Sequence, residues 1–253
     1  MSKNTIQSVN RALEILCLIG ESNTPLTIQS LSKALKLPRT TLYAPINSLE
    51  KYDFIHRDAT TKTLSLGWRM YVLGLSFARK HIDPIIEAEA RKLKQILKQT
   101  IHISIYAKSN KVIFVHTETP DKPYVISPHL GFISHAHCTA SGKILLAYQE
   151  KNDIDWIYEP EMLQRRTDKT ITDPERLLKE LDIIRKQGYA VDNEESSLGL
   201  TCVAVPIKNL EGKCIASISV SGPKDEIIEN IGKIKSELFT VASYINSLGK
   251  LDL

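Results

Sequence analysis

The sequence predicts an α+β protein in which a small helical domain is joined by a helix to a larger domain built around a sheet. Three observations support this. The chain of 253 residues exceeds the usual size of a single domain. Residues 1–67 combine short amphipathic helices with a hairpin pattern, whereas residues 83–253 mix strand and helix patterns. Between them, residues 68–82 form a helical segment with a dense apolar side, which ends at the Asp83-Pro84 break.

The composition is typical of a folded protein of the cell interior. Hydrophobic residues make up 42% of the chain and charged residues 25%, and eleven Gly and eleven Pro exclude a collagen-like or low-complexity chain. The longest strongly apolar stretches, such as residues 13–19, are far shorter than the ~18 residues of a membrane span. The N-terminus has no apolar core of a signal peptide. We therefore expect a soluble, cytoplasmic protein.

The cysteines support the same compartment. Cys17, Cys138, Cys202 and Cys214 are widely scattered, without a CxxC pair. This spacing predicts reduced thiols rather than a disulfide framework.

The net charge of +4 is unevenly distributed. Residues 1–80 contain eleven Lys and Arg against five Asp and Glu, whereas residues 81–253 contain twenty-two against twenty-four. A basic small domain suggests that the N-terminal end binds a polyanion. Many basic faces are merely solvated, so the charge alone leaves both interpretations open.

Three short helices are predicted in the first fifty residues. The first begins after Ser8, its expected N-cap, and its inward-facing residues are Val9, Ala12, Leu13, Leu16 and Cys17. The second begins after Thr27, its expected cap, and its inward-facing residues are Ile28, Leu31, Ala34 and Leu35. A tight turn at residues 36–38 leads to the third helix, which buries Leu42, Ile46 and Leu49. Two short helices joined by a tight turn are typical of a helix-turn-helix.

A hairpin follows at residues 54–67, where Leu64 and Leu66 alternate and the tip is rich in Thr. It is typical of a wing, and together with the helices it predicts a winged helix-turn-helix domain over residues 1–67. Such a module can also bind protein, but the basic excess in the same residues favours DNA. The side chains expected to contact phosphates or base edges are Arg11, Thr27, Arg39, Thr40, Thr41, Tyr43, Asn47, Arg57 and Lys62.

The larger domain is predicted from its periodicities. The expected helices span residues 85–99, 174–186 and 225–248, with Gly188 as the end signal of the second. The expected strands span residues 101–107, 111–116, 189–191, 202–207 and 214–220. The chain has no Walker or dinucleotide-binding glycine motif.

Two serines suggest a ligand site in this domain. Ser219 and Ser221 point to the same face of their strand, and hydroxyls on such a face require either solvent or a polar ligand. Asp192 and Cys202 are candidates to complete the lining of that site.

Motifs in both domains resemble one known family. The N-terminal motifs are residues 8–16 (SVNRALEIL), 37–42 (LPRTTL), 49–55 (LEKYDFI) and 64–67 (LSLG). The C-terminal motifs are residues 137–143 (HCTASGK), 188–195 (GYAVDNEE), 199–206 (GLTCVAVP) and 217–223 (SISVSGP). In this order, from about Gln7 to Leu248, they resemble the isocitrate-lyase-regulator (IclR) family of bacterial transcription factors.

The resemblance implies a DNA-binding regulator, a repressor or an activator, with a GAF-like α/β effector-binding domain over residues 83–253. It implies that a small metabolite, a carboxylic acid, modulates the affinity for a pseudo-palindromic operator. The matching effector contacts are Ala140, Ser141, Asp192, Cys202, Ser219 and Ser221, and the backbone N–H groups of the first two suit a carboxylate at a helix start. The linker helix at residues 68–82 would pack in a dimer or a dimer of dimers, and the alternative is that its apolar side packs within its own chain. The alternative is a metabolite-binding protein whose N-terminal module docks another protein.

The chain departs from the family pattern inside the third helix. Pro45 stands where an ordinary helix former is usual, and Ala44 stands where a basic residue is common. A proline there removes the hydrogen bond to the Thr41 carbonyl and costs ~3 kcal/mol in a straight helix. We therefore expect a kink near Thr41, or a shorter regular helix, and an altered base-reading face.

Two rival chemistries use the residues around Cys138. His135, His137 and Cys138 could hold Zn²⁺, but no second paired motif completes such a site. Alternatively, Cys138 or Cys202 could act as a nucleophile, with His137 as the base and Asp192 orienting it. Neither cysteine lies in a nucleophile signature, so we expect a protein that is not an enzyme and has no metal or cofactor.

Overall fold

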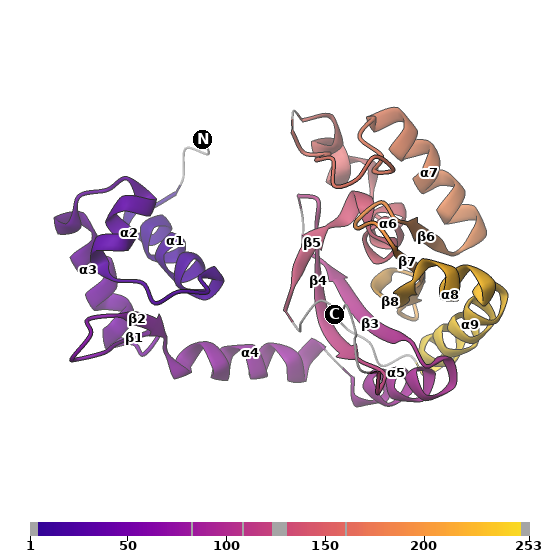
Figure 1. Cartoon of the computed structure of the whole chain (residues 1–253), viewed down its shortest axis with the longest axis horizontal. Coiled ribbons are helices and arrows are strands. Elements are labelled where there is room, and N and C mark those ends of the chain that lie inside the picture. The colour runs from indigo at the N-terminus through magenta and orange to yellow at the C-terminus, as the bar shows by residue number, and fades with distance from the viewer. Residues whose placement is uncertain (1–4, 82, 108, 123–130, 160, 249–253) are drawn as a thin grey trace. The chain divides into compact units, whose positions relative to one another are not determined.

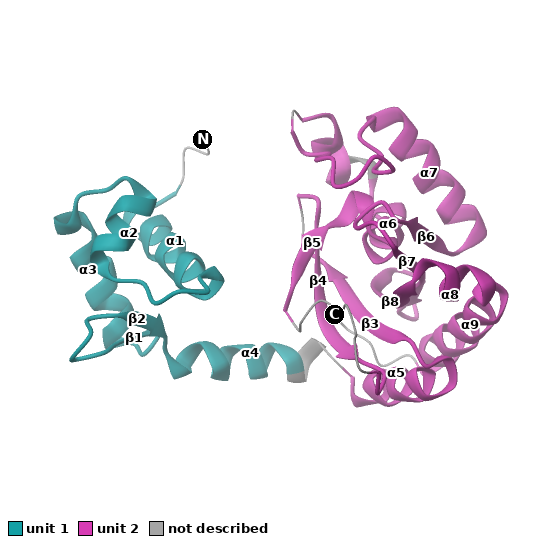
Figure 2. Cartoon of the chain, in the orientation of Figure 1, with its two compact units in different colours: residues 1–79 teal, residues 80–253 magenta. Residues whose placement is uncertain are grey.

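Short helices and one hairpin build the N-terminal part of the chain (Figure 1). Its elements are α1 (Gln7–Glu21), α2 (Ile28–Leu35), α3 (Arg39–Lys51), β1 (Ile55–Arg57), β2 (Leu64–Leu66) and α4 (Trp68–His81). The computed structural model describes residues 5–248 apart from 82, 108, 123–130 and 160. The chain divides into two units, residues 1–79 and 80–253 (Figure 2). Within the described residues, no helix is both long and apolar enough to span a membrane.

The second helix begins and ends as its sequence predicts. The Thr27 side chain accepts a hydrogen bond from the Ser30 N–H, and the Ser30 side chain accepts one from the Thr27 N–H, which makes a capping box. Lys36 adopts the left-handed conformation with φ 53° and ends the helix. Ala34, expected to face inward, is exposed.

The inward face of α1 differs from the prediction. Ile15 and Ile19 are buried, whereas Val9, Leu13 and Cys17 are exposed. Ser8 lies inside the helix, and the N-cap is Ile6, without a side-chain cap. Apolar residues occupy more than one side of this helix, so the helical periodicity alone predicted a stripe of residues next to the one that is buried. Packing against the buried residues of α3 determines which stripe is covered.

The third helix runs without interruption through Pro45. The expectation of a shorter regular helix is therefore wrong, while a kink near Thr41 stays a prediction. Pro45 removes one backbone donor only, and the buried side chains of Leu42, Ile46 and Leu49 hold α3 against α1 and α2 on both sides of the gap.

The hairpin forms as predicted. β1 and β2 pair antiparallel, with Ile55 opposite Leu66 and Arg57 opposite Leu64. At the tip, Asp58 Oδ1 accepts hydrogen bonds from the backbone N–H groups of Thr60 and Thr61. These bonds fix the turn as an Asx-type motif.

The second unit contains one six-stranded antiparallel sheet in the order β5-β4-β3-β8-β7-β6. Its strands are β3 (Thr100–Tyr106), β4 (Lys111–Glu118), β5 (Ile133–His135), β6 (Ala190–Asn193), β7 (Leu200–Lys208) and β8 (Cys214–Pro223). Its α-helices are α5 (Pro84–Leu97), α6 (Ala140–Ala147), α7 (Pro174–Gln187), α8 (Lys224–Glu229) and α9 (Ile231–Leu248). Two 3₁₀ helices, η1 (Ala136–Cys138) and η2 (Lys151–Tyr158), complete the described elements.

The helix predicted over residues 225–248 is two helices, so that expectation is wrong. Asn230 separates them as the C-cap of α8, and its side-chain amide donates to the Glu226 carbonyl. Asparagine is favoured at helix ends because its side chain competes for backbone hydrogen bonds.

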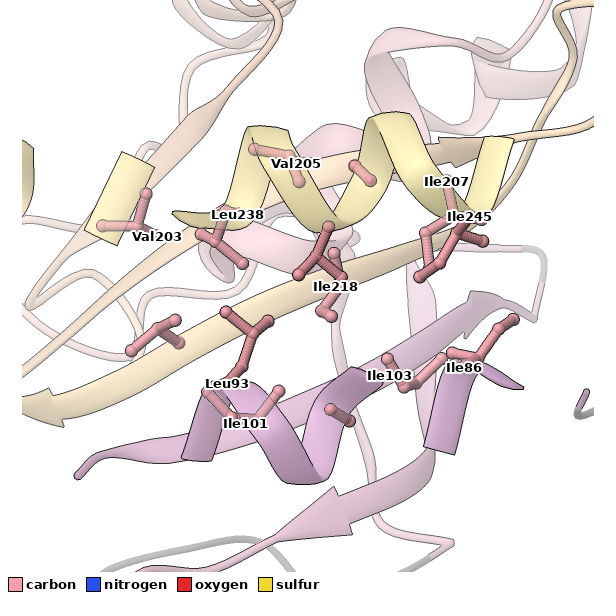
Figure 3. Close-up of a cluster of buried hydrophobic side chains, with 14 of the residues drawn as sticks. Ile86, Leu93, Ile101, Ile103, Val203, Val205, Ile207, Ile218, Leu238 and Ile245 are labelled. Carbon is pink, nitrogen blue, oxygen red and sulfur yellow. The ribbon is translucent and has the colours of Figure 1, made fainter. Parts of the chain in front are cut away.

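Each face of the sheet has its own apolar layer. Side chains of α5 and α9 pack on one face against β3, β7 and β8, as Figure 3 shows for Leu93, Leu238 and Ile218. Helices α6 and α7 contribute the apolar cluster on the other face. β8 alternates between these faces: Ala216, Ile218 and Val220 belong to the first layer. Ser217, Ser219 and Ser221 therefore point to the α6 side, as the strand pattern predicts for the last two.

Candidate functional site

A cavity of about 310 Å³ opens on the α6 side of the sheet. The residues that the sequence singles out for a ligand all line it: Ala140, Ser141, Asp192, Cys202, Ser219 and Ser221. They come from α6, β6, β7 and β8, so the fold brings together residues up to 81 positions apart. Further residues line the cavity that were not predicted from the sequence, among them His102, Phe114, Phe132, Thr139, Arg166 and Leu200.

The first turn of α6 faces this cavity. Thr139 caps the helix, and its Oγ1 accepts a hydrogen bond from the Gly142 N–H at 3.1 Å. The N–H groups of Ala140 and Ser141 belong to the first turn, which has no intrahelical acceptors for them. They therefore present backbone donors and the positive end of the helix dipole to the cavity.

Gly142 allows this turn to approach the preceding segment. A Cβ at this position would lie 2.3 Å from the Cα and the carbonyl oxygen of Ala136, closer than real atoms come. The glycine of the 137–143 motif is thus required by close backbone packing.

Ser219 and Ser221 of β8 are buried, and each has a hydrogen-bond partner within the protein. Ser141 Oγ donates to Ser219 Oγ at 2.9 Å. Ser221 Oγ lies 3.0 Å from His102 Nε2, and Thr117 Oγ1 lies 3.0 Å from His102 Nδ1. Burial lowers the pKa of His102 to about 4, so its imidazole is neutral at physiological pH.

Asp192 is fully buried and organises the turn that follows β6. Its Oδ1 accepts hydrogen bonds from the Glu195 N–H at 2.7 Å and the Ser196 N–H at 3.3 Å, and its Oδ2 accepts one from Ser196 Oγ at 2.5 Å. Burial raises the pKa of Asp192, although these hydrogen bonds oppose that shift. Ser196 also lines the cavity, so Asp192 shapes the cavity wall as well as contributing to it.

A buried ion pair supports the same turn. Lys143 Nζ lies 2.5 Å from Glu195 Oε1 and donates to the Val191 carbonyl at 2.7 Å. Thr167 and Thr170 hold the turn from another side, through hydrogen bonds to the carbonyls of Glu194 and Glu195. None of these residues was predicted to be functional from the sequence. A lysine inside the otherwise apolar α6 pattern was the available signal.

The donor set around Cys138 does not fit a metal ion. Ligand atoms of His135, His137 and Cys138 lie within 4.8 Å of one another. However, His137 Nε2 lies 3.0 Å from the Gln164 carbonyl and so must carry the hydrogen, while its Nδ1 lies 2.8 Å from Asn110 Nδ2. Both ring nitrogens are therefore used by the protein. Burial raises the pKa of the Cys138 thiol to about 12, which opposes the thiolate that Zn²⁺ requires.

Among the described residues, no histidine is hydrogen-bonded to the Cys138 or Cys202 thiol as a cysteine nucleophile would require. The His137 ring bonds to Asn110 and to the Gln164 carbonyl rather than to a thiol. The Cys138 thiol is 3.8 Å from the His135 carbonyl. Burial raises the pKa of Cys202 well above its usual value, so neither cysteine is activated.

The predicted DNA-contacting residues are distributed unevenly over the first unit. Arg39, Thr40, Tyr43 and Asn47 are exposed on α3, and Thr41 is half-buried. Arg11 is half-buried on α1, and the Thr27 side chain is engaged in the capping box. The four exposed α3 residues, together with the exposed Lys62 of the hairpin, therefore form the accessible part of the predicted surface.

The wing cations have partners within the protein. Arg57 Nη2 lies 3.0 Å from Glu50 Oε2 and donates to Asn47 Oδ1 at 3.2 Å. Lys62 Nζ donates to the Ala59 carbonyl at 2.7 Å. Contact of either cation with phosphate stays a prediction, and each keeps further N–H donors for it.

Comparisons with known proteins cover both units. A family model described as "Bacterial transcriptional regulator IclR C-terminal" matches residues 76–246, and one described as "IclR helix-turn-helix domain" matches residues 8–59. The regulator KdgR of Escherichia coli K12 is 30% identical over 222 residues, which is 87% of this chain and 83% of KdgR. The regulator BhcR of Paracoccus denitrificans is 32% identical over 221 residues, 86% of this chain and 78% of BhcR.

Solved structures agree in fold. The C-terminal domain of E. coli KdgR is 32% identical, with a TM-score of 0.57 over 64% of this chain and 94% of that domain. An IclR homologue of Microbacterium hydrocarbonoxydans in complex with 4-hydroxybenzoate has a TM-score of 0.79 over 95% of this chain and 98% of its own, at 20% identity. The matched sequence models and relatives show that the chain belongs to the IclR family of bacterial transcriptional regulators.

Proposed function

We propose that this regulator binds a small carboxylic acid in the cavity between α6 and the sheet, and that the acid changes its affinity for an operator. One observation carries the proposal: the six residues chosen from the sequence line a single cavity at a helix N-terminus. The N–H groups of Ala140 and Ser141 suit an anionic oxygen, and the buried serines offer further hydrogen bonds. The homologue that was crystallised with 4-hydroxybenzoate supports an acid as the ligand class.

The remaining lining residues suit the body of such a ligand. Phe114 and Phe132 form an aromatic side of the cavity, with ring centroids 6.2 Å apart. Arg166, which is exposed, supplies a cation to the lining. Asp192 can accept a hydrogen bond from a hydroxyl of the ligand. The cavity then serves binding rather than catalysis.

In the first unit, α3 enters the major groove of the operator and the hairpin lies beside it. Arg39, Thr40, Tyr43 and Asn47 contact DNA from α3, with Thr41, Arg11 and Thr27 nearby and Arg57 and Lys62 on the wing. The helix-turn-helix match and the basic excess of residues 1–80 favour DNA over the alternative of a docked protein. We expect the protein to act in the cytoplasm, where bacterial DNA lies.

Self-association is part of the proposal. Trp68, Tyr71, Val72 and Leu73 on α4 are large apolar side chains with 44–70% of their surface exposed. Contact with the same helix of a second copy would cover them and place two α3 helices on one operator. A dimer or a dimer of dimers satisfies this requirement.

A thermal-shift titration of the full-length protein tests the ligand. Benzoate, 4-hydroxybenzoate, propionate and gluconate are the probes, each paired with its neutral amide. An acid at a hundred times its Kd should stabilise the folded protein by ~2.7 kcal/mol, and the Ser219→Ala/Ser221→Ala variant should lose that shift. Ser217→Ala is the matched control, since Ser217 lies on the same strand face outside the cavity lining. An acid that stabilises the double variant as well as the native chain would contradict the proposed site.

A further inference from the structure

A row of three polar side chains crosses the sheet beneath the cavity. Thr117 on β4 and His102 on β3 are directly opposite each other in the antiparallel register. The Thr117 Oγ1 to His102 Nδ1 distance and the His102 Nε2 to Ser221 Oγ distance are both 3.0 Å. His102 is only 2% exposed, and Ser221, on β8, lines the cavity together with it. Both ring nitrogens are therefore committed to one partner each.

A neutral imidazole has one ring hydrogen, so this row has two self-consistent arrangements. In the first, Thr117 donates to Nδ1 and the Nε2–H donates to Ser221, whose own hydrogen is then free. In the second, the Nδ1–H donates to Thr117, and Ser221 uses its only hydrogen on Nε2. Ser221 thus presents either a donor or only lone pairs to the cavity, and the tautomer of His102 decides which.

The neighbouring groups of the cavity wall are donors. Ser141 Oγ donates to Ser219 Oγ, so the Ser219 hydrogen does not point back at Ser141 and is available to a ligand. Ala140 and Ser141 line the same cavity at the start of α6, where their N–H groups have no acceptor within the helix. An anion has only lone pairs to offer and would be repelled by a Ser221 that presents lone pairs. The first arrangement alone gives Ser221 the same donor role as Ser219 and the two N–H groups of α6.

We propose that His102 is a positioning residue for the ligand: its Nε2–H donates to Ser221, which turns the Ser221 hydroxyl hydrogen toward the same anionic group that Ser219 binds. The inference rests on the proposed acid-binding function and deepens it. The Ser219 and Ser221 wall selects an acceptor such as a carboxylate, and it discriminates against ligands that present an amine or amide N–H at this point. Thr117 acts through His102 by holding Nδ1 as the acceptor.

The tautomer can be measured without any ligand. Full-length protein labelled with ¹⁵N at histidine is examined by long-range ¹H–¹⁵N correlation NMR, with the His102→Gln variant identifying the His102 signals. We expect a protonated Nε2 and an unprotonated Nδ1 in the ligand-free protein. A protonated Nδ1 would overturn the inference, whatever the ligand proves to be.

Affinity gives the second arm, with the same four acids and their amides as probes in calorimetric titrations of the full-length protein. His102→Phe keeps an aromatic side chain but removes both ring nitrogens. It should lower the affinity for the acid that the native chain binds by about ten- to a hundredfold. His102→Gln places an amide N–H near the former Nε2, and it should stay within about threefold of the native affinity.

The outcomes separate this inference from the proposed function. An unchanged affinity in His102→Phe, or an equal loss in a His102→Gln variant that melts like the native chain, would overturn the role of His102. If none of the acids binds the native chain, the proposed ligand class fails, and the NMR measurement still decides the tautomer. If His102→Phe does not fold, the His102→Gln affinity and the NMR result decide the question.

Discussion

Lys143 Nζ lies 2.5 Å from Glu195 Oε1, and both side chains are buried, the lysine to 1% exposure. The pair joins α6, whose first turn faces the cavity, to the turn that Asp192 organises. Burying two charges costs desolvation energy that their mutual attraction and further hydrogen bonds must offset. The pair therefore fixes the position of α6 relative to this turn, and the shape of the cavity depends on that position.

Removing one partner of this pair should destabilise the protein strongly. Lys143→Met leaves the Glu195 carboxylate buried without its cation, and we expect the free energy of unfolding to fall by about 3–5 kcal/mol. Lys143→Met/Glu195→Met removes both charges and should recover part of that loss. Urea denaturation measures both values. Asp182→Ala, which breaks an exposed pair with Arg185, is the control and should change stability by less than about 1 kcal/mol. A Lys143→Met effect as small as the control would contradict the ion-pair argument.

Replacing Pro45 should stabilise α3. Pro45→Ala restores an N–H that can donate to the Thr41 carbonyl within a helix that is already continuous. Because proline costs ~3 kcal/mol inside a helix but also restricts the unfolded chain, by about 0.4–1 kcal/mol, the net gain should be about 2 kcal/mol. Chemical denaturation of the full-length protein measures this gain. A crystal structure of each protein would show whether the helix axis bends near Thr41 and straightens in the variant. Loss of stability in Pro45→Ala would mean that the proline fits α3 without cost.

The free energy of unfolding should fall as the pH falls below about 6.5, because His102 then becomes protonated in the unfolded chain. Burial lowers the folded-state pKa of His102 from 6.5 to about 4. Below about pH 6.5 the unfolded chain therefore binds a proton that the folded chain does not. The free energy of unfolding falls steadily as a result, until the folded chain also binds the proton at about pH 4. The total loss of unfolding free energy from this protonation is about 3 kcal/mol. The difference in unfolding free energy between the native chain and His102→Gln should shrink over this range. A difference independent of pH would show that the His102 pKa is not lowered.

DNA affinity should depend on salt through the exposed cations of the first unit. Arg39→Ala should weaken binding to a duplex enriched from random DNA, and it should reduce the slope of log affinity against log salt by about one. Fluorescence anisotropy at several salt concentrations measures the slope. Arg176→Ala, an exposed arginine of the second unit, should leave the slope unchanged. Equal slopes for the native chain and Arg39→Ala would remove Arg39 from the set of phosphate contacts.

The local features of this fold were predictable because they depend on neighbours in the sequence. Thr27 caps α2 and Gly188 ends α7, as their residue types indicate. The period of two in a strand placed Ser219 and Ser221 on one face, which is the face of the cavity. The family resemblance supplied Ala140 and Ser141, which periodicity alone would not have selected.

Where several local solutions were equally good, tertiary contacts decided. Helix α1 offers more than one apolar stripe, and packing with α3 buries Ile15 and Ile19 instead of Leu13. Likewise, Arg57 is a free cation in the sequence but is bound by Glu50 once the hairpin lies beside α3.

The sequence by itself determined the two units, most of the strands and helices, and the serines of the cavity, because helix caps and strand alternation are short-range effects. Only the tertiary structure decided what those serines can do. Ser221 meets His102 across 119 positions of the chain, and Lys143 meets Glu195 across 52. Such pairings arise from the strand order and from helix packing, which no local pattern encodes.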